Sequence, residues 1–160
     1  MTKNDFSTEL RELYDGELLG EAFFECLLCQ FEDLEQSRKL TIALQLETET
    51  KAKLRPFIVA AGMALNDDGE ARNTGKELAA GFSGKSWGEV MSGLLDILGP
   101  AVQRYQEIFD SSPAEFKELA NSMLIHEKAL LNFVELELEG KPNSTNAMSD
   151  QLVYGLGKAT

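Results

Sequence analysis

The sequence has very few of the residues from which most metal and redox sites are built. Its 160 residues include one histidine and two cysteines. One histidine excludes any site that takes several imidazoles from the same chain, and two cysteines are too few for a disulfide framework. Lysine and arginine are also scarce, at 15 against 27 aspartates and glutamates, so the net charge is −12. Because such a chain repels phosphates, we expect no nucleic-acid partner.

Long apolar runs are missing as well. No stretch approaches the roughly 18 apolar residues that a membrane span needs, so we expect no membrane partner. The first residues, MTKNDFSTEL, are polar and lack the apolar stretch of a secretory signal, which favours a cytoplasmic location. The hydrophobic fraction of 43% is ordinary for a globular protein, and the length suits one domain with a single core.

What the sequence does have is a helical periodicity without a convincing alternating strand. The pattern predicts four long helices over about 7–31, 33–61, 86–109 and 113–139, and a short helix near 76–80. Capping boxes at Ser86–Glu89 and Ser112–Glu115 mark the starts of the last two long helices. Gly140, followed by Pro142, marks the end of the fourth.

The second and third long helices are separated by a long, glycine-rich connection. Together with short first and third connections, it predicts an all-α, up-down four-helix bundle with a long crossover between helices two and three. We expect residues 1–142 to form this bundle. Residues 143–160 are mostly polar, and we expect a tail that packs loosely on its surface.

Several ionisable residues fall on the inward faces of the predicted helices. Glu17 and Glu21 lie in the middle of the apolar stripe of the first helix, and Glu47 lies in that of the second. On the fourth helix, His126 and Glu127 flank the apolar stripe on opposite sides. Inward acids are costly unless they are paired or bound to a metal. The inward acids Glu17, Glu21 and Glu47 therefore point to a partner of opposite charge, a bound metal or a buried polar pocket.

The segments that carry these residues resemble the ferritin-like superfamily, in particular its small rubrerythrin-related di-iron carboxylate branch. They are DGELLGEAFFE, LQLETETKAKLRPF and LIHEKALLNFVELELEG. The family pattern places one glutamate on each of two helices and a Glu-x-x-His on each of the other two. By this resemblance Glu21, Glu47 and His126 match three of the six expected ligands. Thr50 and Met123 stand where a histidine and an acid are expected.

The resemblance implies a metalloprotein with oxygen or peroxide chemistry. Three retained ligands, supplemented by Glu17 and Glu127, suit a single iron, manganese or zinc ion. The alternative is a non-catalytic dimeric bundle that has lost its metal and binds a partner or small ligand. For Glu17 and Glu21 the simpler interpretation is neutralisation by Lys51, Arg55 or Arg11, and for His126 it is a hydrogen-bonded core histidine.

The first helix has a second apolar face, opposite the first, made of Leu19, Phe23, Cys26 and Leu27. A helix that is apolar on both sides is either central or covered by another chain or segment. Because no helix is central in a four-helix bundle, we expect a homodimer whose interface includes this helix. Coverage by residues 152–156 of the same chain is the alternative.

Overall fold

A computed structural model describes residues 6–67 and 69–156, and in these residues the fold is all-α, as predicted. The helices are α1 (Ser7–Leu28), α2 (Leu34–Ala60), α3 (Glu70–Ala80), α4 (Trp87–Ser111), the 3₁₀ helix η1 (Ala114–Phe116), α5 (Lys117–Leu138) and α6 (Asn146–Ser149). Over the described ranges, no helix combines the length and the apolar character that crossing a bilayer requires.

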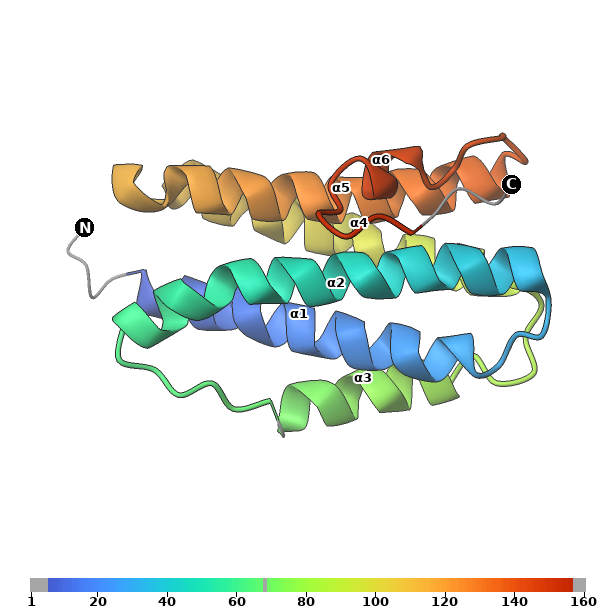
Figure 1. Cartoon of the computed structure of the whole chain (residues 1–160), viewed down its shortest axis with the longest axis horizontal. Coiled ribbons are helices and arrows are strands. Elements are labelled where there is room, and N and C mark those ends of the chain that lie inside the picture. Colours follow the sequence, from blue (N-terminus) through green and yellow to red (C-terminus); the bar gives the residue numbers. More distant parts are fainter. Residues whose placement is uncertain (1–5, 68, 157–160) are drawn as a thin grey trace.

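Four long helices, α1, α2, α4 and α5, run along the longest dimension of the molecule (Figure 1). α1 packs against α2, and α4 packs against α5. Residues 61–86, which connect α2 to α4, return along the length of the molecule and include α3 (Figure 1). As a result, α2 and α4 run in the same direction.

The helix ends follow local hydrogen bonding. The Asp33 side chain accepts a bond from the backbone N–H of Gln36 at the start of α2, and the capping box of Ser86 and Glu89 forms at the start of α4. The capping box predicted at Ser112 is wrong. The Ser112 hydroxyl instead donates to the carbonyl oxygen of Phe109 at 2.8 Å, and the chain makes a turn of 3₁₀ helix before α5 begins.

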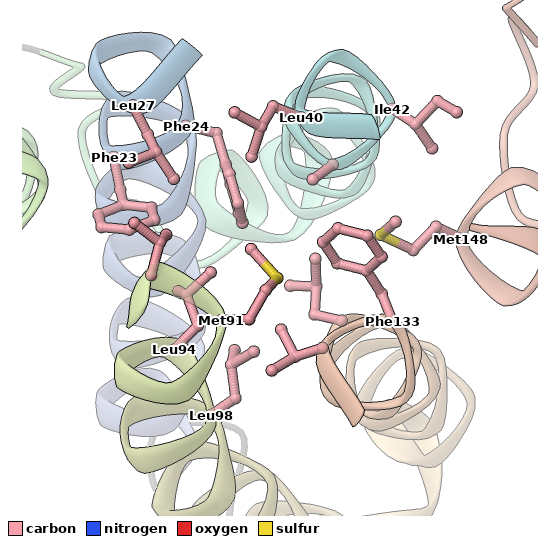
Figure 2. Packing of buried hydrophobic residues seen from close by; sticks show 14 of the residues in the cluster. Phe23, Phe24, Leu27, Leu40, Ile42, Met91, Leu94, Leu98, Phe133 and Met148 are labelled. Atoms are coloured by element: carbon pink, nitrogen blue, oxygen red, sulfur yellow. The ribbon is translucent and has the colours of Figure 1, made fainter. Parts of the chain in front are cut away.

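The interior consists of two apolar clusters, one near each end of the long helices. The first cluster includes Phe24, Leu46, Met91, Leu94, Leu130 and Phe133. The second cluster includes Leu10, Leu54, Ile108 and Met123. In Figure 2, Phe24, Met91 and Phe133 of the first cluster point toward one another from α1, α4 and α5. A polar layer separates the two clusters. It is formed by the buried polar side chains of residues 17–21 of α1, 47–51 of α2 and 126–127 of α5.

α3 covers the second apolar face of α1. The rings of Phe23 and Phe82, which follows α3, meet edge to face with centroids 5.8 Å apart. Gly75 lies directly on the backbone carbonyl of Leu19, where a Cβ atom would collide. This face therefore has a cover within the chain, although not the 152–156 segment considered above. The homodimer stays a prediction, but the exposed face that motivated it is not there.

The segment after α5 is packed more closely than the loose tail that the sequence suggested. The Met148 side chain of α6 is fully buried in the first cluster. The Ser144 hydroxyl donates to the Glu137 carboxylate, which also accepts a 2.8 Å bond from the indole of Trp87. One buried methionine in a mostly polar stretch is enough to fix the segment, and periodicity gives no sign of it.

Candidate metal centre

Three helices each bring one buried ionisable residue into the polar layer. Glu17 comes from α1, Glu47 from α2 and His126 from α5. One ligand atom from each lies within 4.8 Å of the other two. Glu17 and His126 are each only 1% exposed, so water has almost no access to the group.

The polar atoms of this group face each other without hydrogen-bond donors between them. The Nε2 atom of His126 lies 3.3 Å from Oε2 of Glu17 and 3.4 Å from Oε2 of Glu47. Among the described residues, both carboxylate oxygens of Glu17 and the Nε2 atom of His126 have no hydrogen-bond partner. Buried polar atoms in native proteins are almost always satisfied, so these three atoms need an explanation.

Thr50 determines how the imidazole of His126 is oriented. Its hydroxyl donates to the carbonyl oxygen of Leu46 at 2.8 Å, and the same oxygen lies 3.2 Å from Nδ1 of His126. A hydroxyl has only one proton, so toward the ring the Thr50 oxygen accepts a bond from Nδ1–H. In the neutral ring, Nε2 then carries the lone pair, which is directed at Glu17 and Glu47. This is the arrangement of a metal-binding histidine held by an outer hydrogen bond.

Two glycines of α1 make room for the side chains of other helices. A Cβ atom at Gly20 would lie 2.5 Å from the carboxyl carbon of Glu47. A Cβ atom at Gly16 would lie 2.5 Å from the hydroxyl of Tyr105 on α4. Both glycines are visible in the sequence, but only the packing of the helices shows which side chains they admit.

The electrostatics of the layer favour bound protons or another cation. Burial raises the pKa of Glu17 well above its ordinary value, and the charges of Glu47 and Glu127 raise it further. Burial also raises the pKa of Glu127 to about 7, although His126 acts in the opposite direction. Burial opposes the charged form of His126, but Glu47 and Glu127 outweigh it, so the pKa of this residue is also raised.

A metal ion held by Glu17, Glu47 and His126 would provide a partner for Nε2 and for an oxygen of Glu17. Zinc binds histidine nitrogen and carboxylate oxygen at about 2.0–2.2 Å, so neighbouring ligand atoms of a tetrahedral site lie about 3.4 Å apart. The distances from His126 Nε2 to Glu17 and Glu47 match this value. Oε2 of Glu127 lies 3.9 Å from the same nitrogen, but Glu127 is not one of the three residues whose ligand atoms all lie within 4.8 Å of one another.

Glu21 also matches the family pattern, but it is not part of the group formed by Glu17, Glu47 and His126. Its carboxylate forms ion pairs with the buried Lys51 and, at 3.3 Å, with Arg72 of α3. It also accepts a 2.9 Å hydrogen bond from Thr48. The simpler interpretation, neutralisation by Lys51, thus describes Glu21, whereas Glu17, one helical turn earlier, faces Glu47 and His126.

Tyr14 of α1 and Tyr105 of α4 are both buried side chains. The Tyr14 hydroxyl donates to Asp67 at 2.6 Å, away from the three ligand atoms. Tyr105 lies beside the layer, where burial raises its pKa well above the ordinary value and Glu17, Glu127 and Glu47 raise it further. Of these two tyrosines, Tyr105 is therefore the one whose hydroxyl lies near the charges of the layer.

Comparisons of the chain with protein-family models, with curated proteins and with solved structures found no match.

The metal-free protein should become less stable as the pH rises from about 5 to about 8. The pKa values of Glu17, Glu127 and His126 are raised by folding, so the folded chain binds protons that the unfolded chain releases in this range. We expect a loss of about 2–3 kcal/mol in the free energy of unfolding, measured by urea denaturation in the presence of a chelator. Saturation with Zn²⁺ should raise the free energy of unfolding more at pH 8 than at pH 6, because the metal must displace bound protons from its ligands at the lower pH.

The variant Glu127→Gln provides the control for this pH dependence. It removes the carboxyl group whose pKa is about 7, so its stability should change less with pH than that of the unmodified chain. A free energy of unfolding that is constant or rises between pH 5 and 8 in the metal-free protein contradicts the account.

Replacing Thr50 by valine should weaken metal binding about 10–100-fold without touching a ligand. Valine has a similar shape but cannot accept the Nδ1–H bond that holds the imidazole of His126. Thr48→Val is the matched control, because the Thr48 hydroxyl donates to Glu21, which is outside the group of three, and the exchange is otherwise identical. Titration calorimetry measures the Zn²⁺ affinity of both variants. Equal affinities for the two variants would mean that Thr50 has no positioning role.

Proposed function

We propose that this chain is a metalloprotein that binds one divalent ion between α1, α2 and α5. Glu17 and Glu47 are its anionic ligands, His126 is its neutral nitrogen ligand, and Glu127 completes the set. The observation that carries the proposal is the position of His126 Nε2, 3.3 Å from a Glu17 oxygen and 3.4 Å from a Glu47 oxygen. Among the described residues, this nitrogen and both Glu17 oxygens have no hydrogen-bond partner. The carboxylate and imidazole ligands suit iron, manganese or zinc, whereas the absence of thiolates from the group disfavours copper(I).

The arrangement of the helices supports a ferritin-like class for this metalloprotein. We interpret α1, α2, α4 and α5 as a four-helix bundle in which residues 61–86 form the crossover between the second and third bundle helices. Inward carboxylates and a histidine in the middle of such a bundle are the ligand types that this class uses. Here the set is reduced, and α4 contributes Tyr105 at this level instead of an acid.

The residues of the chain hold and shield the site. Thr50 fixes the ring of His126, while Gly20 leaves space for the Glu47 carboxylate. The apolar clusters on either side exclude water, which strengthens every charge interaction in the layer. An iron or manganese ion held there would supply redox chemistry with oxygen or peroxide. Tyr105 is the residue placed to donate a hydrogen bond to a molecule in the layer.

A bundle that has lost its metal is the competing function. In that case Glu17 and Glu127 carry protons, His126 is either neutral or charged, and the chain binds only a partner or a small ligand. The raised pKa values of these groups agree with this interpretation as well as with metal binding. The two functions therefore differ in one measurable property, the affinity of the layer for a divalent ion.

Elemental analysis tests the proposal most simply. The protein is purified without a histidine tag, loaded anaerobically with Fe²⁺, Mn²⁺ or Zn²⁺, and desalted before the metal is counted. We expect about one ion per chain. Glu17→Gln should lose the ion, because it exchanges an anionic ligand for a neutral one. Its metal-free form should fold as well as the unmodified chain, since the amide replaces a carboxyl whose pKa is raised.

Glu21→Gln is the matched control, one turn along the same helix. It should retain the ion, because Glu21 pairs with Lys51 and Arg72 outside the group. It should also lower the free energy of unfolding by about 3 kcal/mol, because Lys51 is left buried without its carboxylate. Unmodified protein that retains none of the three ions after loading would overturn the proposal in favour of the metal-free bundle.

A further inference from the structure

A cavity of about 330 Å³ lies between α1 and α4, and its inner end reaches the polar layer. The residues that line it from these two helices include Gly16, Leu19, Gly20 and Phe23 of α1 and Leu94, Leu98, Ala101 and Tyr105 of α4. Glu47 and Glu127 also line it, and both belong to the candidate metal centre. The cavity therefore connects directly with the polar layer.

The small residues explain why a cavity exists at this level. Gly16 and Gly20 of α1 lie on the same wall, and Ala101 of α4 is also part of the lining. A larger side chain at Ala101 would project into the cavity, whereas a Cβ atom at Gly16 or Gly20 would meet Tyr105 or Glu47, which also line it. Other clefts of the described chain have a similar volume, and this one differs from them in its predominantly apolar lining, which is typical of small-molecule binding sites.

The walls set the chemical character of an occupant. Leucine, phenylalanine, isoleucine, alanine and glycine supply most of the lining. Figure 2 shows Leu94, Leu98, Phe23 and Phe24, all of which line the cavity, gathered where α1 and α4 face each other. An apolar cavity of about 150 Å³ is enough for benzene. A cavity about twice as large accepts a two-ring aromatic or a medium-length alkyl chain.

The charges exclude an anionic occupant. Arg104 is the only basic residue among those that line the cavity. Its guanidinium is already held by two bonds to Glu12, at 2.8 and 2.7 Å, and by a third to Glu107 at 3.2 Å. At the inner end, Glu47 and Glu127 present carboxyl groups. A carboxylate or phosphate would find no unpaired cation in this lining and would be repelled at its inner end.

We propose that this cavity binds an uncharged apolar molecule, an aromatic or medium-chain alkyl compound, with one end against the layer of Glu47 and Glu127. The claim that this molecule lies beside a metal ion rests on the proposed function. The binding itself does not, because the cavity is formed by the chain alone.

Binding is measured on metal-free protein with N-phenyl-1-naphthylamine, an uncharged dye whose fluorescence rises in apolar surroundings. We expect one dye per chain, displaced by decan-1-ol at concentrations at least ten times lower than by decanoate. Ala101→Phe should weaken dye binding at least tenfold, because the ring fills the cavity. Gln103→Phe adds the same ring at an exposed position of α4 and should bind the dye like the unmodified chain.

Three results would overturn the proposal. They are equal dye binding by the Ala101→Phe and Gln103→Phe variants, displacement by decanoate as readily as by decan-1-ol, and displacement by decylamine alone. The last would mean that the carboxylates, rather than the apolar walls, recognise the ligand. Near-ultraviolet circular dichroism establishes that both variants keep the packing of the unmodified chain.

A second measurement separates this inference from the proposed function. Mn²⁺ bound in the layer should broaden the proton resonances of decan-1-ol in the cavity, and Glu17→Gln should abolish the broadening but keep the alcohol bound. If no Mn²⁺ binds while the alcohol still does, the proposed function fails and the apolar site stands. If Mn²⁺ binds and the alcohol does not, the inference fails alone.

Discussion

The structure depends on one constraint: two carboxylates and an imidazole are buried together, and the described residues offer no hydrogen-bond partner to Nε2 of His126 or to either oxygen of Glu17. Removing an ion from water into a protein interior costs several kcal/mol even after relaxation. Only a cation placed among Glu17, Glu47 and His126 offsets this cost, and that cation is either a proton or a metal. The packed helices supply the stability needed to hold such a group, because an apolar cluster lies on each side of the polar layer.

The buried glutamates of α1 differ in whether lysine or arginine residues of other helices neutralise them. Glu21 has its own cations in Lys51 and Arg72, so it is neutralised within the chain and forms part of the framework. Glu17, one turn away, has no lysine or arginine among its hydrogen-bond partners in the described residues, and the basic group beside it is His126, with Nε2 at 3.3 Å. α3 makes this division possible, because it brings Arg72 to Glu21 while it covers the apolar face of α1. Glu21, which belongs to the framework of the fold, and Glu17, which belongs to the candidate metal centre, can thus be substituted independently.

The sequence predicted the all-α class and the inward positions of Glu17, Glu47 and His126, since helical periodicity sorts residues by face. It did not distinguish Glu17 from Glu21, because residues four apart lie on the same face of a helix. That choice depends on Lys51 and Arg72, which come from other helices. The role of Thr50 was equally hidden. Its hydroxyl meets His126 across 76 positions of sequence, and only the packing of α2 on α5 brings them together.

The central claim is that a metal ion rather than shared protons satisfies the buried group. Anomalous diffraction from crystals of the zinc-loaded protein tests it most directly. The account predicts one anomalous peak in the polar layer, within about 2.2 Å of Nε2 of His126 and of an oxygen of both Glu17 and Glu47. Crystals that show zinc only at surface carboxylates, with the three buried residues still facing one another, would contradict it.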